Sequence, residues 1–248
     1  MKLENPPRQY LADPFVISRD GRDFCFVENF DYDRNKGNIA VYEITETGST
    51  RIGTALDEKF HLSFPFIFEY RGGMFMCPET SENGDIRIYR CVEFPLRWKL
   101  EKIVMKGLSA ADTMFLEHGG RWWMFTNIDV TGCGDHCSEL FIFSSDSPFG
   151  DDWVSHSCNP VVVDASRARN GGFVRDGDTL YRISQRQGFS FYGKEAAINE
   201  IVELTDSTYV ESPICSITPT FADDVLGTHH FHSNGNVTVF DFMSKLRN

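Results

Sequence analysis

The sequence predicts an all-β fold, a five-bladed β-propeller that occupies residues 1–248 as a single domain. Three observations support this prediction. One hairpin-like stretch recurs along the chain, its copies are spaced about 50 residues apart, and further strand-like segments follow each of the first four copies. A strand-like repeat of this length is typical of propellers, because helical solenoids carry an apolar pattern with a period of 3.6 residues instead.

The clearest copy is residues 111–127, ADTMFLEHGGRWWMFTN, in which two short apolar runs flank a Gly-Gly turn. The other copies are residues 12–28, 63–79, 168–185 and 227–242. The first two of these align without a gap and superpose Gly21 on Gly72 and Glu28 on Glu79. The fourth copy has one inserted residue in its turn, and the fifth is weaker. The blades are therefore expected to open near residues 13, 64, 112, 169 and 228.

An alternating run rich in β-branched and aromatic residues follows each of the first four copies, which is the pattern of a half-buried strand. These runs are residues 37–44, 84–91, 138–145 and 196–204. They supply outer strands for blades that need about four strands each. Because an open sheet edge invites aggregation, we expect either residues 8–11 or residues 237–242 to close the ring by pairing one terminus with the other.

The net charge of −12 disfavours two classes of partner. Nucleic-acid binders need a basic stripe that displaces counterions, and anionic membranes attract basic patches. No segment approaches the roughly 18 consecutive apolar residues of a membrane span, and the N-terminal stretch lacks the apolar core of a signal peptide. We therefore expect neither nucleic acid nor a membrane span, and a cytoplasmic location.

Seven cysteines in such a chain favour reduced thiols, several of them as small apolar residues inside strands. The loop TGCGDHC, residues 131–137, places four potential metal ligands close in sequence: Cys133, Asp135, His136 and Cys137. A four-ligand zinc site normally draws two pairs of ligands from separated segments. A Gly-rich loop tip is therefore the favoured interpretation, and we expect no metal and no other cofactor.

Two outer segments, residues 84–105 and 138–161, share one plan: an apolar strand, a proline in the turn, and a tryptophan (Trp98 or Trp153) that opens the last strand. This plan resembles the blades of five-bladed glycosidases such as arabinanases, levansucrases and invertases. The run LSFPFIFEYRGGMFMCPETSENGDIRIYR, followed by ADTMFLEHGGRWWMF, is more similar still to the N-terminal propeller domain of glucosamine inositolphosphorylceramide transferases. The resemblance covers residues 12–242 and implies a place among capsule or lipopolysaccharide sugar enzymes.

The glycosidase resemblance implies catalytic roles for carboxylates that open the blades. Asp13 matches the general base and Asp112 the carboxylate that adjusts pKa and position. The expected acid is missing, because the fourth copy opens on Arg169, which stays charged and cannot donate a proton at neutral pH. Glu79, at the returning end of its hairpin, is either a displaced acid or a carboxylate on the rim.

Arginines concentrate in the fourth copy of this acidic chain. Arg169, Arg182 and Arg186 suit a sugar phosphate, a nucleotide-sugar diphosphate or an acidic sugar, because a guanidinium binds such groups with two parallel hydrogen bonds. The alternative for Arg182 is an ion pair with a buried acid. The other expected substrate-binding residues are Gln185, Tyr192 and His230; the ring of Tyr192 would stack on a sugar.

The favoured function is recognition of an anionic or nucleotide-linked sugar in the synthesis of a surface polysaccharide or glycoconjugate. The chain would act as a glycosyltransferase or as the sugar-binding partner of one. One alternative is a glycoside hydrolase with Asp13 as base, Asp112 as modulator and Glu79 as acid. The other is a non-catalytic binding platform. The arginine that replaces an essential acid favours the first interpretation.

Overall fold

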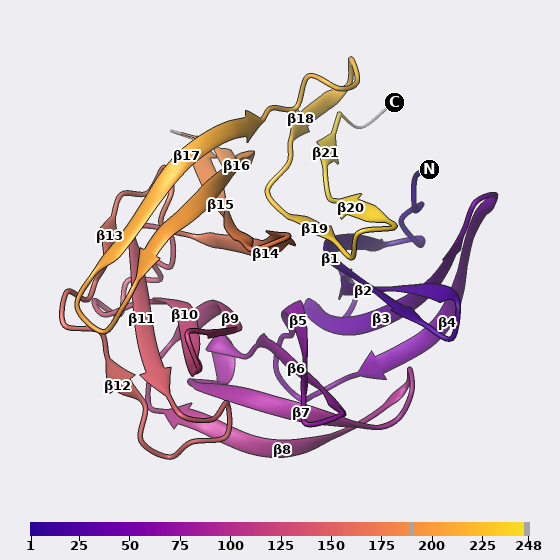
Figure 1. Ribbon diagram of the computed structural model, residues 1–248. Coiled ribbons are helices and arrows are strands. Elements are labelled where there is room, and N and C mark those ends of the chain that lie inside the picture. The colour runs from indigo at the N-terminus through magenta and orange to yellow at the C-terminus, as the bar shows by residue number, and fades with distance from the viewer. Residues whose placement is uncertain (189–190, 246–248) are drawn as a thin grey trace. The chain divides into compact units, whose positions relative to one another are not determined.

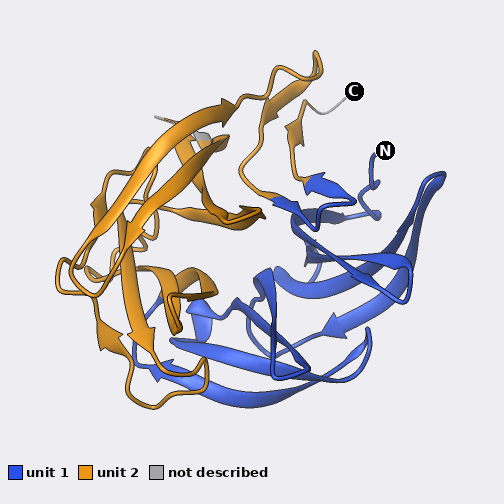
Figure 2. Ribbon diagram, viewed as in Figure 1, with its two compact units in different colours: residues 1–109, 232–239 blue, residues 110–231, 240–248 orange. Residues whose placement is uncertain are grey.

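The computed structural model describes residues 1–188 and 191–245 and contains strands joined by short turns (Figure 1). Within these residues the one helical element is a 3-10 turn at Ser81–Asn83, and no helix has the length and apolarity needed to cross a membrane. The chain divides into two compact units (Figure 2). Unit 1 comprises Met1–Ser109 and His232–Val239, and unit 2 comprises Ala110–Phe231 and the chain from Phe240 onward.

Unit 1 contains two four-stranded antiparallel sheets in which each strand pairs with the next along the chain. The strands of the first sheet are β1 (Gln9–Arg19), β2 (Arg22–Asp31), β3 (Lys36–Thr45) and β4 (Gly48–Leu56). Those of the second are β5 (Ser63–Tyr70), β6 (Gly73–Glu79), β7 (Asp85–Glu93) and β8 (Arg97–Lys106). Meanders of this kind are the blades of propellers.

Unit 2 contains a five-stranded sheet and a four-stranded sheet of the same design. One is formed by β9 (Ala110–His118), β10 (Arg121–Ile128), β11 (Glu139–Ser145) and β12 (Val154–Ser155), with β13 (Val162–Val163) also paired to β11. The other is formed by β14 (Asn170–Asp176), β15 (Thr179–Gly188), β16 (Phe191–Leu204) and β17 (Tyr209–Ile217). The expected all-β class with propeller blades is confirmed by these four sheets.

The prediction of a fifth blade was wrong. Residues 225–244 form two separate two-stranded sheets, one of β18 (Val225–Gly227) with β21 (Met243–Ser244), the other of β19 (Phe231–Ser233) with β20 (Thr238–Phe240). The backbone N–H groups of His229 and His230 donate to the Asp241 carboxylate at 3.0 and 3.1 Å. A side chain therefore takes the place of a strand ladder here, and the residues that the structure describes form four blades.

The start of three blades shows the same backbone irregularity. Asp13, Phe64 and Asp112 have φ of 49°, 44° and 47°, and each sits at a break in the register between the first two strands of its sheet. A residue other than glycine in this left-handed region costs roughly 1–3 kcal/mol and persists only where its surroundings enforce it. In the fourth blade Asn170 and Gly172 both pair with β15 and the irregularity lies between them, so Gly171 rather than Arg169 lies at the bulge.

The core of unit 1 lies between its two sheets. Fully buried side chains of the first sheet, Phe26 and Ile39, pack in one cluster with Met76 and Tyr89 of the second. The backbone joins the sheets at Gly37, whose N–H donates to His61 Nδ1 at 2.9 Å and whose carbonyl accepts from Leu62 N–H at 3.2 Å. A Cβ atom at Gly37 would collide with the Leu62 carbonyl oxygen.

The hairpin β19–β20 packs on the first sheet, so both ends of the chain contribute to unit 1 (Figure 2). His232 Nδ1 accepts a hydrogen bond from Val16 N–H at 3.2 Å. Asn234 donates to Ser18 Oγ at 2.8 Å and to Asp23 Oδ1 at 3.1 Å. Val239 joins an apolar cluster on this sheet. The sequence predicted that the two termini would meet by pairing of strands. Side chains of the hairpin make the contacts instead, and residues 9–11 pair with β2 of their own sheet.

Replacing Gly37 by Ala should lower the free energy of unfolding by about 1–3 kcal/mol, because overpacking at this joint displaces the backbone. Gly48→Ala is the matched control, since a Cβ there has no neighbour within 4 Å. It should change stability by less than about 0.5 kcal/mol. Urea unfolding of both variants measures the difference, and equal stabilities would contradict the assignment of Gly37 as a joint.

Stability should fall as the pH drops from about 6.5 to about 4, because burial lowers the pKa of His232 to about 4. The folded state holds this imidazole neutral. The neutral imidazole therefore contributes its full stability above the unfolded pKa, and acidification lowers the free energy of unfolding by on the order of 3 kcal/mol in total. His232→Asn can still accept from Val16 N–H but does not titrate. The melting temperature of this variant should change less with pH than that of the wild type. The same pH dependence in both proteins would refute the assignment of His232 as the titrating group.

Candidate functional site

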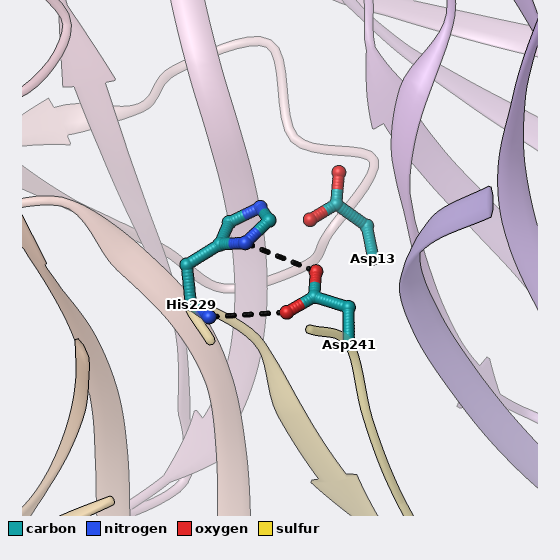
Figure 3. A group of neighbouring side chains, drawn as sticks. All are labelled: Asp13, His229 and Asp241. Carbon is teal, nitrogen blue, oxygen red and sulfur yellow. Dashed lines mark hydrogen bonds and ion pairs between the residues drawn. The ribbon is translucent and has the colours of Figure 1, made fainter. Parts of the chain in front are cut away.

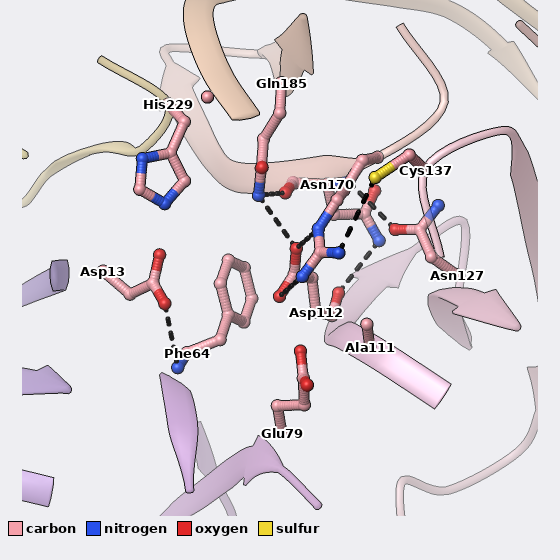
Figure 4. A network of polar contacts seen from close by, with 12 residues as sticks. Asp13, Phe64, Glu79, Ala111, Asp112, Asn127, Cys137, Asn170, Gln185 and His229 are labelled. Carbon is pink, nitrogen blue, oxygen red and sulfur yellow. Dashed lines mark hydrogen bonds and ion pairs between the residues drawn. The ribbon is translucent and has the colours of Figure 1, made fainter. Parts of the chain in front are cut away.

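The centre of the candidate site in unit 2 is Asp112, a buried carboxylate at the bulge of β9. Arg169 donates to both of its oxygens, from Nε at 2.6 Å and from Nη2 at 3.3 Å. Gln185 Nε2 donates to Oδ2 at 2.8 Å (Figure 4). The structure therefore brings together three of the residues that the sequence singled out, and the guanidinium compensates the charge of the carboxylate.

Two asparagines that the sequence interpretation did not select hold this group in place. Asn170 donates through Nδ2 to the Asp112 carbonyl at 2.9 Å, and its own N–H donates to Asn127 Oδ1 at 2.9 Å. Asn127 in turn donates to the carbonyl of Ala168 at 3.0 Å. Both amides are buried. The segment that carries Arg169 is thus fixed on both sides, and its position is set before any ligand arrives.

An exposed aromatic ring covers the arginine. The Arg169 guanidinium lies 5.4 Å from the ring centroid of Tyr192, whose side chain is 49 % exposed. The ring of His229 meets Tyr192 edge-on at 5.4 Å. We call these three residues the Arg169–Tyr192–His229 surface. It offers a half-exposed aromatic ring beside a cation whose side chain is 12 % exposed.

His229 is oriented by Asp241, since its Nδ1 lies 3.1 Å from Asp241 Oδ2 (Figure 3). Burial alone would raise the pKa of Asp241, but the charges of His229 and His230 and the hydrogen bonds from His229 hold it below its usual range. The neighbouring His230, the histidine expected to bind substrate, has a fully buried side chain. His229 is therefore the residue of this pair with exposed side-chain surface.

Arg182 is fully buried in the fourth blade, and its position matches the alternative of an ion pair with a buried acid. Its Nε and Nη2 donate to the two oxygens of Glu211, each at 2.8 Å. Burial would lower the pKa of Arg182, but the charge of Glu211 raises it above its usual value. Arg186, by contrast, is exposed on the β15–β16 hairpin and pairs with Glu195 at 3.2 Å.

Asp13 and Glu79, the base and acid of the hydrolase interpretation, both belong to unit 1. Asp13 is buried and accepts a hydrogen bond from Phe64 N–H at 3.2 Å (Figure 4). Glu79 is half-buried and accepts from Ser81 Oγ at 2.7 Å. Their catalytic roles stay predictions.

Unit 1 also holds a titratable group that the sequence interpretation missed. Glu28 is buried and lies 3.2 Å from the Tyr10 hydroxyl and 3.6 Å from His61 Nε2. Burial and the nearby Glu28 carboxylate raise the pKa of Tyr10, and burial lowers that of His61. A signal was present in the sequence, because Glu28 superposes on Glu79 and shares its place at the end of a returning strand.

The cysteine-containing loop is ordered by its own carboxylates. Asp129 accepts from the backbone N–H groups of Gly134, Thr131 and Gly132, which lower its pKa to about 2. Asp135 accepts from Cys137 N–H at 2.8 Å. In the described part of the chain, no three of the potential ligands between residues 131 and 137 converge on one point. The interpretation of this segment as a loop tip without a metal stays a prediction.

Removing the charge of Glu211 should be far more damaging than removing that of Glu195. Glu211→Gln leaves Arg182 buried without a counter-charge, which should lower the free energy of unfolding by about 3–5 kcal/mol. Glu195→Gln breaks the pair with exposed Arg186 and should cost less than about 1 kcal/mol. Chemical denaturation of both variants tests this contrast. Similar losses would show that Arg182 does not depend on Glu211.

Comparison with known proteins identifies the family. Residues 2–225 match the family described as glucosamine inositolphosphorylceramide transferase 1, N-terminal. The transferase of that name from Arabidopsis thaliana is 38 % identical over 212 residues, which cover 83 % of this chain and 27 % of the relative. The protein from Oryza sativa subsp. japonica is 36 % identical over 215 residues, with 84 % and 28 % covered. This chain thus spans about a quarter of the length of these relatives.

Solved structures with low sequence identity show the same fold. The catalytic domain of the GH62 α-L-arabinofuranosidase from Coprinopsis cinerea has a TM-score of 0.71 at 12 % identity, over 100 % of this chain and 89 % of that one. A family 117 glycoside hydrolase from Zobellia galactanivorans has a TM-score of 0.61 at 11 % identity, with 85 % and 71 % covered. The match over residues 2–225 decides the relationship: the chain belongs to the family of the N-terminal region of glucosamine inositolphosphorylceramide transferase 1.

Proposed function

We propose that this protein is a carbohydrate-recognition propeller that binds an anionic or nucleotide-linked sugar during the synthesis of a glycoconjugate. The observation that carries the proposal is the Arg169–Tyr192–His229 surface, where an exposed tyrosine ring lies over a guanidinium that is held by Asp112, whose carboxylate also accepts from Gln185. Sugars present apolar faces that stack on aromatic rings, and their hydroxyl groups bind polar neighbours.

Each exposed residue of the surface has a distinct part in this proposal. Tyr192 stacks on the sugar ring, and the guanidinium of Arg169 attracts the negative charge of a phosphate or carboxylate. Arg186, exposed on the same β15–β16 hairpin as Tyr192, adds positive charge near the ligand. Asp112 orients Arg169 and does not contact the ligand.

The family relationship supports the biosynthetic context. The relatives are named glucosamine inositolphosphorylceramide transferase 1, and this chain corresponds to about a quarter of their length. We propose that the chain provides sugar recognition to a glycosyltransferase, either within one polypeptide or as a separate partner. The further alternatives of a glycoside hydrolase and of a non-catalytic platform are separated by the assay below.

The hydrolase alternative receives less support from the site. Hydrolysis generally needs a protonated carboxyl group beside the leaving oxygen. In unit 2 both oxygens of the Asp112 carboxylate already accept hydrogen bonds from Arg169, and Oδ2 also accepts from Gln185. Arg169 itself cannot supply a proton at neutral pH.

Calorimetric titration with a panel of nucleotide sugars, sugar phosphates and uronic acids tests the proposed function. Tyr192→Ala should weaken binding about tenfold, which is the loss of roughly 1.4 kcal/mol of stacking. Tyr32→Ala, which removes an exposed tyrosine of unit 1, is the control and should leave the affinity unchanged. Arg186→Ala should weaken binding of charged ligands and reduce its dependence on salt.

Three outcomes decide among the candidate functions. Absence of binding by the wild-type protein to every member of the panel, or equal affinities of the wild type and Tyr192→Ala, would overturn the proposal. Release of nitrophenol from nitrophenyl glycosides, abolished by Glu79→Gln, would favour the hydrolase. Binding without nucleotide release, with or without an acceptor sugar, would favour the platform.

A further inference from the structure

Unit 1 contains an open groove of about 370 Å³ whose walls come from β1, β5 and the C-terminal hairpin β19–β20. We call it the β1–β5 groove. Its volume falls within the range of small-molecule sites in proteins, about 300–1,000 Å³. The groove belongs entirely to unit 1, whereas the Arg169–Tyr192–His229 surface belongs to unit 2.

The floor of the groove is apolar and firmly held. Phe15, Phe68 and Met74 line it, and each is at least nine-tenths buried. The ring of Phe68 is stacked between those of Phe66 and Phe75, with centroid distances of 6.2 and 5.7 Å. Phe15 packs edge-on against Phe64 at 5.1 Å. The floor therefore presents aromatic and thioether surface whose position does not depend on a ligand.

Polar groups surround this floor. His232 Nδ1 accepts from Val16 N–H, so the neutral imidazole must carry its proton on Nε2 and can donate it to a ligand. Glu69 and Asn236 are exposed at the rim and offer a carboxylate and an amide. The amide of Asn234, by contrast, already donates to Ser18 and Asp23 and serves to hold the hairpin.

The charge of the lining defines what the groove can bind. Among the residues that line it in the described structure, none is Lys or Arg, and Glu69 contributes a negative charge. An anionic ligand would be repelled there, in contrast to the Arg169–Tyr192–His229 surface, which includes a guanidinium. A sugar ring has apolar faces and a polar edge, so its shape and polarity are complementary to an apolar floor with hydrogen-bond donors and acceptors on the rim.

We propose that the β1–β5 groove is a second sugar site, which binds an uncharged monosaccharide unit. The ring packs on the small exposed surfaces of Phe68 and Met74, which are 8 % and 9 % exposed, while Phe15 supports this floor from within the core. The hydroxyl groups of the sugar bond to His232 Nε2, Glu69 and Asn236. This site goes beyond the proposed function, because it lies in the other unit and selects against the charge that the Arg169–Tyr192–His229 surface selects for. Either site can be present without the other.

The methionines provide a direct measurement of binding. In protein labelled with ¹³C at the methionine methyl groups, Met74 lines the groove and Met76 is fully buried in the core. Titration with methyl glucoside, methyl galactoside and methyl mannoside should shift the Met74 signal saturably for at least one sugar and leave Met76 unchanged. Met74→Leu assigns the signal. Glucuronic acid, which carries a negative charge, should bind at least tenfold more weakly.

Matched variants locate the contacts. Glu69→Ala should weaken sugar binding at least fivefold and Asn236→Ala at least threefold, whereas Glu46→Ala, an exposed glutamate outside the groove, should have no effect. Tyr192→Ala should also leave the Met74 shift intact, so failure of this site and failure of the proposed function are separable. The inference is overturned if Met74 shows no saturable shift with any neutral sugar in large excess. Equal affinities of Glu69→Ala and wild type, or equal binding of glucuronic acid and neutral sugars, would overturn it as well.

Discussion

The left-handed bulge at the start of a blade is the constraint on which much of this structure depends. At Asp13, Phe64 and Asp112 the backbone leaves the regular strand for two residues and then resumes pairing. Such a bulge turns the side chain away from the two faces of the sheet. The same local geometry presents a carboxylate in the first and third blades and buries a phenyl ring in the second. The bulge is thus a fixed feature of the repeat, and the residue placed on it decides between binding chemistry and packing.

The sequence predicted the parts of the fold that arise from local pattern. Turn glycines and alternating apolar runs located the strands of four blades, because these signals act within a few residues. The fifth copy has comparable residues, but its backbone donors bond to the side chain of Asp241, a contact that alternation does not encode. At the candidate site the structure brings Asp112, Arg169, Gln185 and Tyr192 together, and their roles stay predictions. Arg182 and His230 are buried, which the sequence could not show, since residue type does not reveal whether a side chain at a strand end is buried.

Charge compensation explains how an acidic chain keeps so many arginines in one blade. Arg182 bonds to Glu211 in the interior, Arg169 to Asp112 at the edge of the interior, and Arg186 to Glu195 at the surface. A buried guanidinium without an acid would be very unfavourable, whereas an exposed pair contributes little. The three pairs therefore form a gradient, in which the first stabilises the blade, the second positions a cation, and the third remains open to exchange its partner for a ligand.

The hairpin at residues 232–239 determines when unit 1 can finish folding. Val16 and His232 touch although 216 positions separate them, so the first unit cannot be completed until nearly all of the second has been synthesised. Contacts between residues so distant in sequence slow folding, because the chain must lose the entropy of a long loop before the contact forms. Until then, the apolar surface of β1 that later meets the hairpin is open to solvent. During translation this surface would be a natural binding site for a chaperone, and a nascent chain cut before residue 232 would keep it exposed.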